Sequence, residues 1–469
     1  TPEESLELLL RLKDIQNLVI EWPENTKAKK VISANFSNFS FKVRNLNDWF
    51  SLEGELKIDE NHVIDLQKIL KNYQKGNRFI QIDDNQFLAI TEDFKKQIED
   101  IQAFTINDGQ QNMFHNSLIK VMDEILSKGG QISFDRNWQE MLNHLKHASE
   151  KTFDIPSDFK ADLRSYQVDG FLWLSRMAYL GMGSCLADDM GLGKTIEALS
   201  IITSRSHMGP AFVLAPTSVC SNWFNECKRF APTLNPVLFA QSDRKAIISN
   251  LAPKDLIICS YGVLQREIED LSQINWSTVV LDEAQAIKNM ATNRSQAAML
   301  LKGKFKMLMT GTPIENHLGE LWNLFRFLNP GLLGTINSFN EKFAIPIQSF
   351  NDKKAHERLK KMVQPFILRR IKNQVLKDLP PRTEVTLNVE LSHEEADLYE
   401  SLRREALDKI NDTKNSKSDS KPMIVLAEIM KLRRLCCNPS LVIPNMQIKS
   451  SKLALLESIT DDLLASGHK

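Results

Sequence analysis

Apolar and polar positions alternate with period two in the first third of the chain. Alternate residues are apolar at 39–43 and again at 56–58, which predicts half-buried strands. Residues 78–90 contain two apolar runs around a polar Asp-Asp-Asn turn, which predicts a hairpin, and helical spacing follows over 93–127. We therefore expect residues 1–156 to form an accessory α+β domain.

The pattern changes at about residue 157. Short, almost continuous apolar runs now alternate with amphipathic helical segments. Such runs are typical of a parallel sheet with helices on both faces, because its strands are buried on both sides. The sequence thus predicts an α/β fold, with strands at 184–187, 211–215, 256–259, 278–281 and 306–310.

The last part of the chain has a mainly helical pattern. Residues 411–422 are polar without apolar periodicity and are expected to form a loop, and a helix should begin near Met423. Before them, the stretch 353–382 carries ten Lys and Arg against two acids. This basic stretch is either a solvated face or a contact with DNA phosphates, and the pattern leaves both interpretations open.

Composition excludes several classes of function. The chain has 469 residues, with 59 Lys and Arg against 59 Asp and Glu, which excludes a uniformly basic nucleic-acid binder but not a local basic face. No apolar run approaches the roughly 18 residues of a membrane span, so we expect none. The six cysteines form no CxxC pair, which indicates reduced thiols rather than a disulfide framework or a zinc site.

The segment ADDMGLGKT, residues 187–195, has the properties of a phosphate-binding loop between an apolar strand and a helix. Gly191 and Gly193 allow the backbone to curl so that its amides can point at phosphates. Lys194 supplies a cation for the β- and γ-phosphates, and Thr195 supplies a hydroxyl for Mg²⁺. The segment therefore predicts a nucleoside triphosphate site.

Two other predicted strands end in polar side chains. Asp282 and Glu283 follow one of them, where Asp282 would hold Mg²⁺ and Glu283 would orient or deprotonate the attacking water. Thr310, Gly311 and Thr312 end the other. Their hydroxyls could sense the γ-phosphate, although a plain Gly-Pro turn is equally compatible with this segment.

Eight segments resemble, in order, the first half of a Swi/Snf-type ATPase, a branch of the superfamily-two helicase-like motors. The resemblance covers about residues 159–469, and Asp188, which replaces a glycine of the usual phosphate loop, matches the version in this family. Residues 1–156 are similar to the accessory domain that precedes the motor in bacterial members. The segments are LRSYQVDG (163–170), ADDMGLGKT (187–195), LAPTSVCSNW (214–223), CSYGVL (259–264), VVLDEAQ (279–285), LMTGTPIENHLGELWNLFRFLNPG (308–331), FILRR (366–370) and LRRLCCNP (432–439).

The resemblance implies a RecA-like parallel sheet, ATP and Mg²⁺ as ligands, and double-stranded DNA as a partner, with DNA-bound protein as a remodelling target. It also implies roles for individual residues. The implied nucleotide contacts are Arg164, Gln167, Asp188, Asp189, Met190, Gly191, Leu192, Gly193, Lys194 and Thr195. Lys194, Asp282 and Glu283 would be catalytic, Thr195 and Asp282 would hold Mg²⁺, and Gln285, Thr310, Gly311 and Thr312 would couple nucleotide state to DNA. The implied DNA contacts are Thr217, Ser260 and Tyr261, to which the basic stretch adds Lys360, Lys361, Arg369 and Arg370.

The chain departs from the family pattern at two points. Gln285 stands where the family usually has His, and its amide can donate and accept hydrogen bonds but cannot take up charge. The chain also stops before any segment that could supply the second-lobe arginine of this family. Such an arginine contributes about 10³–10⁵-fold in rate in related enzymes, so we expect this fragment to bind ATP but to hydrolyse it slowly.

We expect four parts: an accessory domain (1–156), a first RecA-like lobe (157–330), a helical protrusion (331–385) and a helical insertion with the start of a second lobe (386–469). The expected function is ATP-driven movement along double-stranded DNA in a bacterial cytoplasm, at the nucleoid. A strand-separating helicase and a nucleotide-gated binding module with little turnover remain alternatives.

Overall fold

The computed structural model describes residues 2–12, 15, 18, 29–59, 62–73, 77–107, 109–240, 243–311, 317–375, 385–412, 421–444, 446 and 448–467. The chain divides into two compact units, residues 1–379 and 380–469. No helix among the described residues has the length and apolar content needed to cross a membrane. Thr312, residues 376–382 of the basic stretch and most of the expected polar loop lie outside the described residues.

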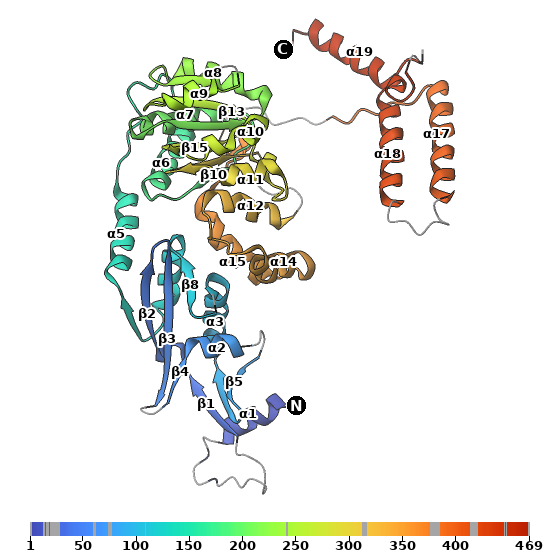
Figure 1. Ribbon diagram of the computed structural model, residues 1–469. Coiled ribbons are helices and arrows are strands. Elements are labelled where there is room, and N and C mark those ends of the chain that lie inside the picture. The colour runs from blue at the N-terminus through green and yellow to red at the C-terminus, as the bar shows by residue number, and fades with distance from the viewer. Residues whose placement is uncertain are drawn as a thin grey trace. The chain divides into compact units, whose positions relative to one another are not determined.

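A parallel sheet of seven strands lies in the first unit (Figure 1), in the order β12-β13-β11-β15-β17-β10-β18. All five apolar runs that the sequence predicts as strands belong to it. Its strands are β10 (Ser184–Leu186), β11 (Ala211–Ala215), β12 (Asn235–Leu238), β13 (Asp255–Ser260), β15 (Thr278–Leu281), β17 (Lys306–Met309) and β18 (Ile367–Leu368).

Helices cover both faces of this sheet, because alternate residues of each strand point to opposite sides. Phe212 and Leu214 of β11 pack in one apolar cluster with residues of α10, α11 and α12. Val213, between them, packs in another cluster with residues of α6, α7 and α8. The predicted α/β fold with two covered faces is confirmed. The helices are α6 (Ser165–Tyr179), α7 (Lys194–Arg205), α8 (Thr217–Phe230), α10 (Tyr261–Leu271), α11 (Asn293–Met299) and α12 (Leu318–Leu328).

The region before the seven-stranded sheet is α+β, as predicted. A sheet ordered β7-β8-β3-β2-β9, with β4 paired to β3, lies next to a three-stranded sheet ordered β1-β6-β5. The predicted hairpin is the antiparallel pair of β5 and β6. These sheets contain β1 (Lys30–Ala34), β2 (Phe39–Leu46), β3 (Trp49–Asp59), β4 (His62–Asp65), β5 (Phe79–Asp83), β6 (Gln86–Ile90), β7 (Ile106–Asn107), β8 (Asn112–His115) and β9 (Gln131–Phe134).

The helices of this region are α1 (Pro2–Leu12), α2 (Leu66–Asn72), α3 (Glu92–Phe104), α4 (Ile119–Leu126) and α5 (Arg136–Glu150). The helical spacing expected over 93–127 is therefore interrupted. Strands β7 and β8 separate α3 from α4, because β8 pairs with β3 and completes the sheet. Tertiary pairing overrides the local periodicity here.

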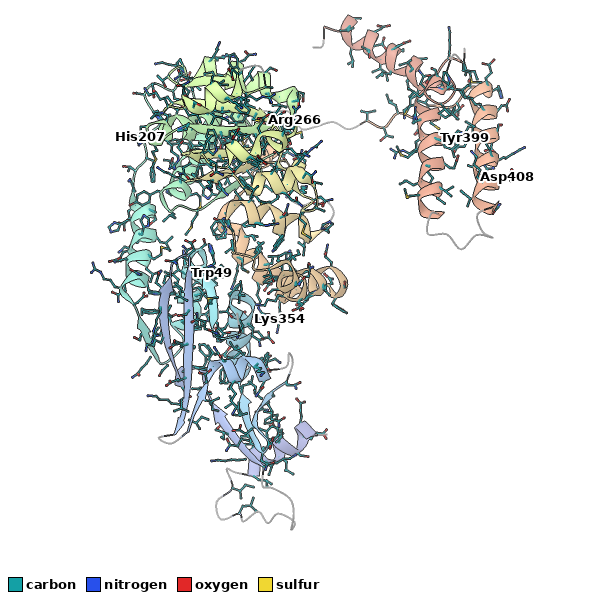
Figure 2. All side chains as sticks on the ribbon, viewed as in Figure 1. Trp49, His207, Arg266, Lys354, Tyr399 and Asp408 are labelled. Atoms are coloured by element: carbon teal, nitrogen blue, oxygen red, sulfur yellow. The ribbon has the colours of Figure 1, made fainter. Side chains whose placement is uncertain are left out.

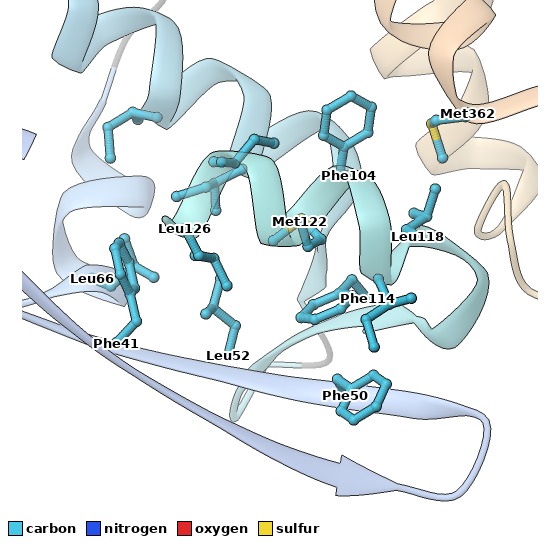
Figure 3. Packing of buried hydrophobic residues seen from close by; sticks show 14 of the residues in the cluster. Phe41, Phe50, Leu52, Leu66, Phe104, Phe114, Leu118, Met122, Leu126 and Met362 are labelled. Carbon is cyan, nitrogen blue, oxygen red and sulfur yellow. The ribbon is translucent and has the colours of Figure 1, made fainter. Parts of the chain in front are cut away.

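The accessory sheets share one apolar core with the helices that follow α12. Phe50, Phe114 and Leu118 belong to the same cluster as Met362 of α15 (Figure 3). Trp49, labelled in Figure 2, packs against Gly331, where an added Cβ would lie 2.6 Å from its ring. The expected protrusion (331–385) begins with α13 (Ile336–Phe339), a π-helical turn (Asn340–Ala344), α14 (Ile345–Phe350) and α15 (Lys353–Val363).

Polar contacts join the same two regions. The guanidinium of Arg358 on α15 pairs with Glu99 at 2.9 Å and with Asp100 at 2.7 Å on α3. The ammonium of Lys342 donates to the backbone carbonyls of Gln102 and Thr105, at 2.7 Å and 2.6 Å, where α3 ends. The accessory region and the protrusion are thus tightly packed together, and the expected four-part division of the chain stays a prediction.

The second unit consists, in its described residues, of helices and short turns: α17 (His393–Asp412), α18 (Lys421–Cys437) and α19 (Ser451–Ala465). The helix expected near Met423 is α18. The carboxylate of Glu395 on α17 accepts a hydrogen bond from the backbone N–H of Ser451 at 3.0 Å, which joins α17 to the start of α19. The expectation that this unit begins a second lobe stays a prediction.

Lys306, the first residue of β17, provides a test of this packing. Its ammonium lies 4.8 Å from the centre of the Phe327 ring, and burial lowers the pKa of Lys306 to about 8. Since this pKa lies below the unfolded value, the charged lysine destabilises the fold below pH 8, and that cost is relieved as the pH rises further. We expect Lys306→Met to raise the melting temperature at pH 7, with a smaller gain at pH 10, measured by thermal unfolding.

The exposed neighbour Lys304 supplies the matched control. Lys304→Met should leave the melting temperature and its pH dependence nearly unchanged. An equal gain for Lys306→Met at pH 7 and pH 10 would show that the buried charge is not the cause.

Candidate functional site

Three adjacent strands bring the predicted chemical groups to one edge of the sheet. In the strand order, β17 lies between β10 and β15. Because these strands are parallel, the loops that follow them leave from the same edge. The phosphate loop follows β10, Thr310 follows β17, and Asp282 and Glu283 follow β15.

The phosphate loop has the curled backbone that its glycines allow. Gly191 and Gly193 have φ of +81° and +82°, in the left-handed region that favours glycine, and Gly193 is the residue before α7. The ammonium of Lys194 donates to the backbone carbonyls of Asp188 at 2.7 Å and Asp189 at 3.2 Å. The cation thus lies inside the loop, where it would meet phosphate oxygens.

Helix α6 packs its first turn against this loop. The Tyr166 hydroxyl and the Gln167 side-chain amide both donate to the carbonyl of Leu192, at 3.0 Å and 3.1 Å. The backbone N–H of Arg164 in turn donates to the Gln167 side chain at 2.9 Å. Gln167 therefore contacts the loop, while its predicted contact with adenine stays a prediction.

Asp282 is almost fully buried at the end of β15. The indole N–H of Trp223 donates to one of its carboxylate oxygens at 2.9 Å, and the Glu283 N–H donates to the other at 2.9 Å. Burial raises the pKa of Asp282, while the Trp223 hydrogen bond and the charge of Lys194 act in the opposite direction. Lys194 and Asp282 thus belong to the same site.

These donors fit a magnesium ion. A desolvated carboxylate at Asp282 gains from a nearby cation, and Thr195, half-buried at the start of α7, adds a hydroxyl oxygen. Mg²⁺ prefers oxygen ligands and is commonly held by one or two protein groups together with substrate phosphates.

A short chain of hydrogen bonds connects the acids to β17. The Gln285 amide donates to the Glu283 carboxylate at 2.6 Å, and its oxygen accepts a hydrogen bond from the Thr310 hydroxyl at 3.3 Å. Glu283 has φ of +47°, an uncommon backbone conformation for a residue other than glycine. Gln285 therefore uses both halves of its amide to link Thr310 to the predicted base, whereas the predicted role of Thr312 falls on a residue outside the described part of the chain.

The structure corrects the expected role of three side chains. Asp188 and Arg370 pair with each other, so the Asp188 carboxylate does not face the phosphate loop and the Arg370 guanidinium is not an exposed DNA contact. Tyr261 is 5% exposed and its hydroxyl donates to the Asp282 carbonyl at 2.8 Å, so it does not point toward a DNA backbone. Neither charge nor position in the sequence distinguishes these buried groups from exposed ones.

The other predicted DNA contacts differ in exposure. Ser260 is buried, and its hydroxyl accepts a hydrogen bond from the Val263 N–H at the start of α10. Thr217, Lys360, Lys361 and Arg369 are exposed. A DNA interface built from these four stays a prediction.

Sequence reasoning missed two residues that contact the site. Trp223 donates to Asp282, and Glu197 on α7 accepts hydrogen bonds from Arg370, the partner of Asp188. Residue spacing carried no signal for either, because both contacts join distant segments.

Comparison with known proteins agrees with this geometry. Residues 166–441, more than half of the chain, match the family model described as SNF2-related domain. The chain belongs to the SNF2 family. Residues 11–156 match a second model, described as bacterial SNF2 helicase associated. Both matches confirm the resemblance that the sequence motifs indicated.

Individual relatives cover most of the chain but less of their own length. YwqA of Bacillus subtilis is 33% identical, in a match that covers 75% of this chain and 38% of YwqA. An uncharacterized ATP-dependent helicase, MG018 of Mycoplasma genitalium, is 32% identical, in a match that covers 86% of this chain and 40% of MG018. The SNF2-family chain thus spans about two fifths of these curated relatives. A solved SWI2/SNF2 ATPase core from Sulfolobus solfataricus, in complex with double-stranded DNA, is 37% identical over 67% of this chain and 68% of its own, with a TM-score of 0.46.

Gly193 tests the loop conformation directly. An added Cβ would face a φ of +82° and lie 2.4 Å from the Gln167 side-chain nitrogen. We expect Gly193→Ala to lower the free energy of unfolding by at least about 1 kcal/mol, measured by urea unfolding. The control is Gly262→Ala, within α10, where an added Cβ meets nothing within 4 Å and the change should be neutral or stabilising by up to about 1 kcal/mol. Equal effects of the two substitutions would contradict the loop geometry.

Proposed function

We propose that this chain carries the ATP-hydrolysing site of a Swi/Snf-type motor, which moves along double-stranded DNA and remodels bound protein without separating the strands. The observation that supports the proposal most strongly is the arrangement of three strand ends. Thr310 and the acids Asp282 and Glu283 directly follow two neighbouring parallel strands, and Lys194 begins the helix after the loop that follows the third. This set supplies a cation, a hydroxyl and two carboxylates to one place.

The loop and the helix behind it would bind the triphosphate. Lys194 now holds two backbone carbonyls, and phosphate oxygens would replace them as acceptors. The amides at the start of α7, together with the helix dipole, favour negative charge there. Thr195 and Asp282 would hold Mg²⁺, which offsets the phosphate charge when bound.

Glu283 would orient the attacking water and take up its proton as the bond to the γ-phosphorus forms and ADP leaves. Gln285 holds the Glu283 carboxylate by a hydrogen bond, which limits its orientation. Thr310, at the other end of that hydrogen-bond chain, would respond to a change at the γ-phosphate. This arrangement would link the state of the nucleotide to β17 and the residues after it.

Family relatives support the assignment of an ATP-driven motor. One relative at 33% identity, INO80 of Arabidopsis thaliana, carries the name chromatin-remodeling ATPase, and MG018 is named an ATP-dependent helicase. Exposed Lys360, Lys361 and Arg369 supply cations for a DNA backbone, which carries no sequence information. Slow turnover by residues 1–469 alone stays a prediction.

Glu283→Gln should remove the base while leaving the binding groups in place. We expect the full-length protein carrying this change to lose about 10²–10⁴-fold in DNA-stimulated kcat, with ATP affinity within about 3-fold of wild type. Phosphate release and the binding of a fluorescent ATP analogue measure the two effects.

Glu269→Gln, an exposed acid on α10, is the matched control and should hydrolyse ATP normally. Unchanged kcat in Glu283→Gln would exclude the assigned role and favour a nucleotide-gated binding module. In the same preparation, efficient ATP-dependent release of a labelled strand from a duplex would favour a strand-separating helicase.

The exposed part of the basic stretch should contribute to DNA affinity. Reversing Lys360, Lys361 and Arg369 to Glu is expected to weaken duplex binding and to lower the slope of log affinity against log salt by up to about 2.7, at about 0.9 per phosphate contact. Fluorescence anisotropy over a salt series measures both quantities.

The control reverses three exposed lysines of the accessory region, Lys42, Lys120 and Lys146, and should change the slope little. If the triple reversal in the basic stretch leaves the slope unchanged, that stretch is a solvated face instead.

A further inference from the structure

The buried side chain of Arg370 links the structural elements around the phosphate loop. Its Nε donates to the Asp188 carboxylate at 2.9 Å, and its Nη2 donates to the two Glu197 carboxylate oxygens at 2.7 Å and 2.9 Å as well as to Asp188. Its Nη1 donates to the backbone carbonyl of Tyr166 on α6. One guanidinium thus joins α6, α7 and the residue at which the loop begins.

The two acids lie at the two ends of the loop. Asp188 lies three residues before Gly191, and Glu197 lies in the first turn of α7, four residues after Gly193. Both side chains are fully buried, with exposures of 0%. Burying a carboxylate without a cation or hydrogen-bond donor is strongly unfavourable. Arg370 therefore stabilises the buried carboxylates of Asp188 and Glu197.

The fit around this cluster is close. A Cβ added at Gly170 on α6 would lie 2.0 Å from a Glu197 carboxylate oxygen and 3.0 Å from the Arg370 guanidinium. The glycine of the segment LRSYQVDG is therefore explained by the space that this pair needs. Loss of the guanidinium would leave Glu197 and Asp188 close together without compensation.

Backbone bonds align the segment of Arg370 with the loop. The N–H of Ala187 donates to the Leu368 carbonyl at 2.7 Å, and the N–H of Asp189 donates to the Arg370 carbonyl at 3.1 Å. The Arg370 N–H donates to the Asp188 carboxylate at 2.8 Å. The first loop residues are thus held from outside by the segment that follows α15.

We propose that Arg370 is a positioning residue of the nucleotide site, which holds the phosphate loop in its receptive shape through Asp188 and Glu197. This inference rests on the proposed function, because it assigns a role in ATP binding. Arg370 acts through the two acids and contacts no substrate itself. Removing it should let both ends of the loop relax, so that Lys194 and the loop amides no longer converge on one place.

The test compares Arg370→Gln with Arg205→Gln. Arg205 is a buried arginine at the far end of α7, where it donates to Thr278 and to the Ser277 carbonyl. Both changes remove a buried guanidinium from the same lobe and should lower the melting temperature. We expect only Arg370→Gln to weaken binding of a fluorescent ATP analogue, by about 10-fold or more, while Arg205→Gln stays within about 2-fold. DNA is left out, so that no DNA contact contributes.

Two further measurements separate positioning from general stability. Amide hydrogen exchange over residues 188–193, without nucleotide, should be faster in Arg370→Gln and unchanged in Arg205→Gln. In a double-mutant cycle, Asp188→Asn combined with Arg370→Gln should weaken ATP binding less than the sum of the two single effects, because Arg370 acts through Asp188.

If Arg370→Gln does not fold, Arg370→Lys takes its place. Lysine keeps the charge but not the planar fork, so we expect a smaller loss of affinity for the ATP analogue.

Wild-type affinity in Arg370→Gln, equal losses in the two arginine variants, or additive effects in the cycle would overturn the inference. Lys194→Ala distinguishes this failure from failure of the proposed function. If wild type binds the analogue and Lys194→Ala does not, the nucleotide site stands whatever Arg370 does; if wild type does not bind it, both proposals fall.

Discussion

The parallel pairing of β10, β17 and β15 is the constraint on which the candidate site depends. Parallel strands end at one edge, so the loop that leads to Lys194 and the residue Asp282, distant in sequence, leave the sheet on the same side. A shift of one residue in β15 would turn its side chains to the opposite faces and displace Asp282. The alternation of buried residues between two helix-covered faces opposes such a shift.

Buried acids give this edge its chemistry, and each has a specific partner. Trp223 donates to Asp282, and Arg370 pairs with Asp188 and Glu197. Burial raises the pKa of Glu197 to about 8; Arg370 opposes this shift, and the negative charge of Asp188 adds to it. The shape of the site therefore depends on residues that would not touch a nucleotide.

The accessory region is joined to the protrusion and not simply appended to the lobe. Both contribute to one apolar core, and Arg358 and Lys342 of the protrusion contact α3. Helix α15 leads through a short turn to β18, which pairs with β10 beside the phosphate loop. The segment that contains Arg370 thus lies between the accessory contacts and the nucleotide site.

The sequence alone determined the parts whose signals are local. Apolar runs predicted the five strands, and the glycines with Lys194 predicted the phosphate loop. The position of Asp282 and Glu283 directly after an apolar run predicted that they lie at the end of a strand. All of these patterns depend only on neighbouring residues. Tertiary structure alone decided which charges are buried and what they pair with. Arg370 stands in a run of cations that looks uniform, yet its partners Asp188 and Glu197 lie 182 and 173 residues away. Burial and pairing result from how distant segments pack, so no local pattern of charge could separate Arg370 from exposed Arg369.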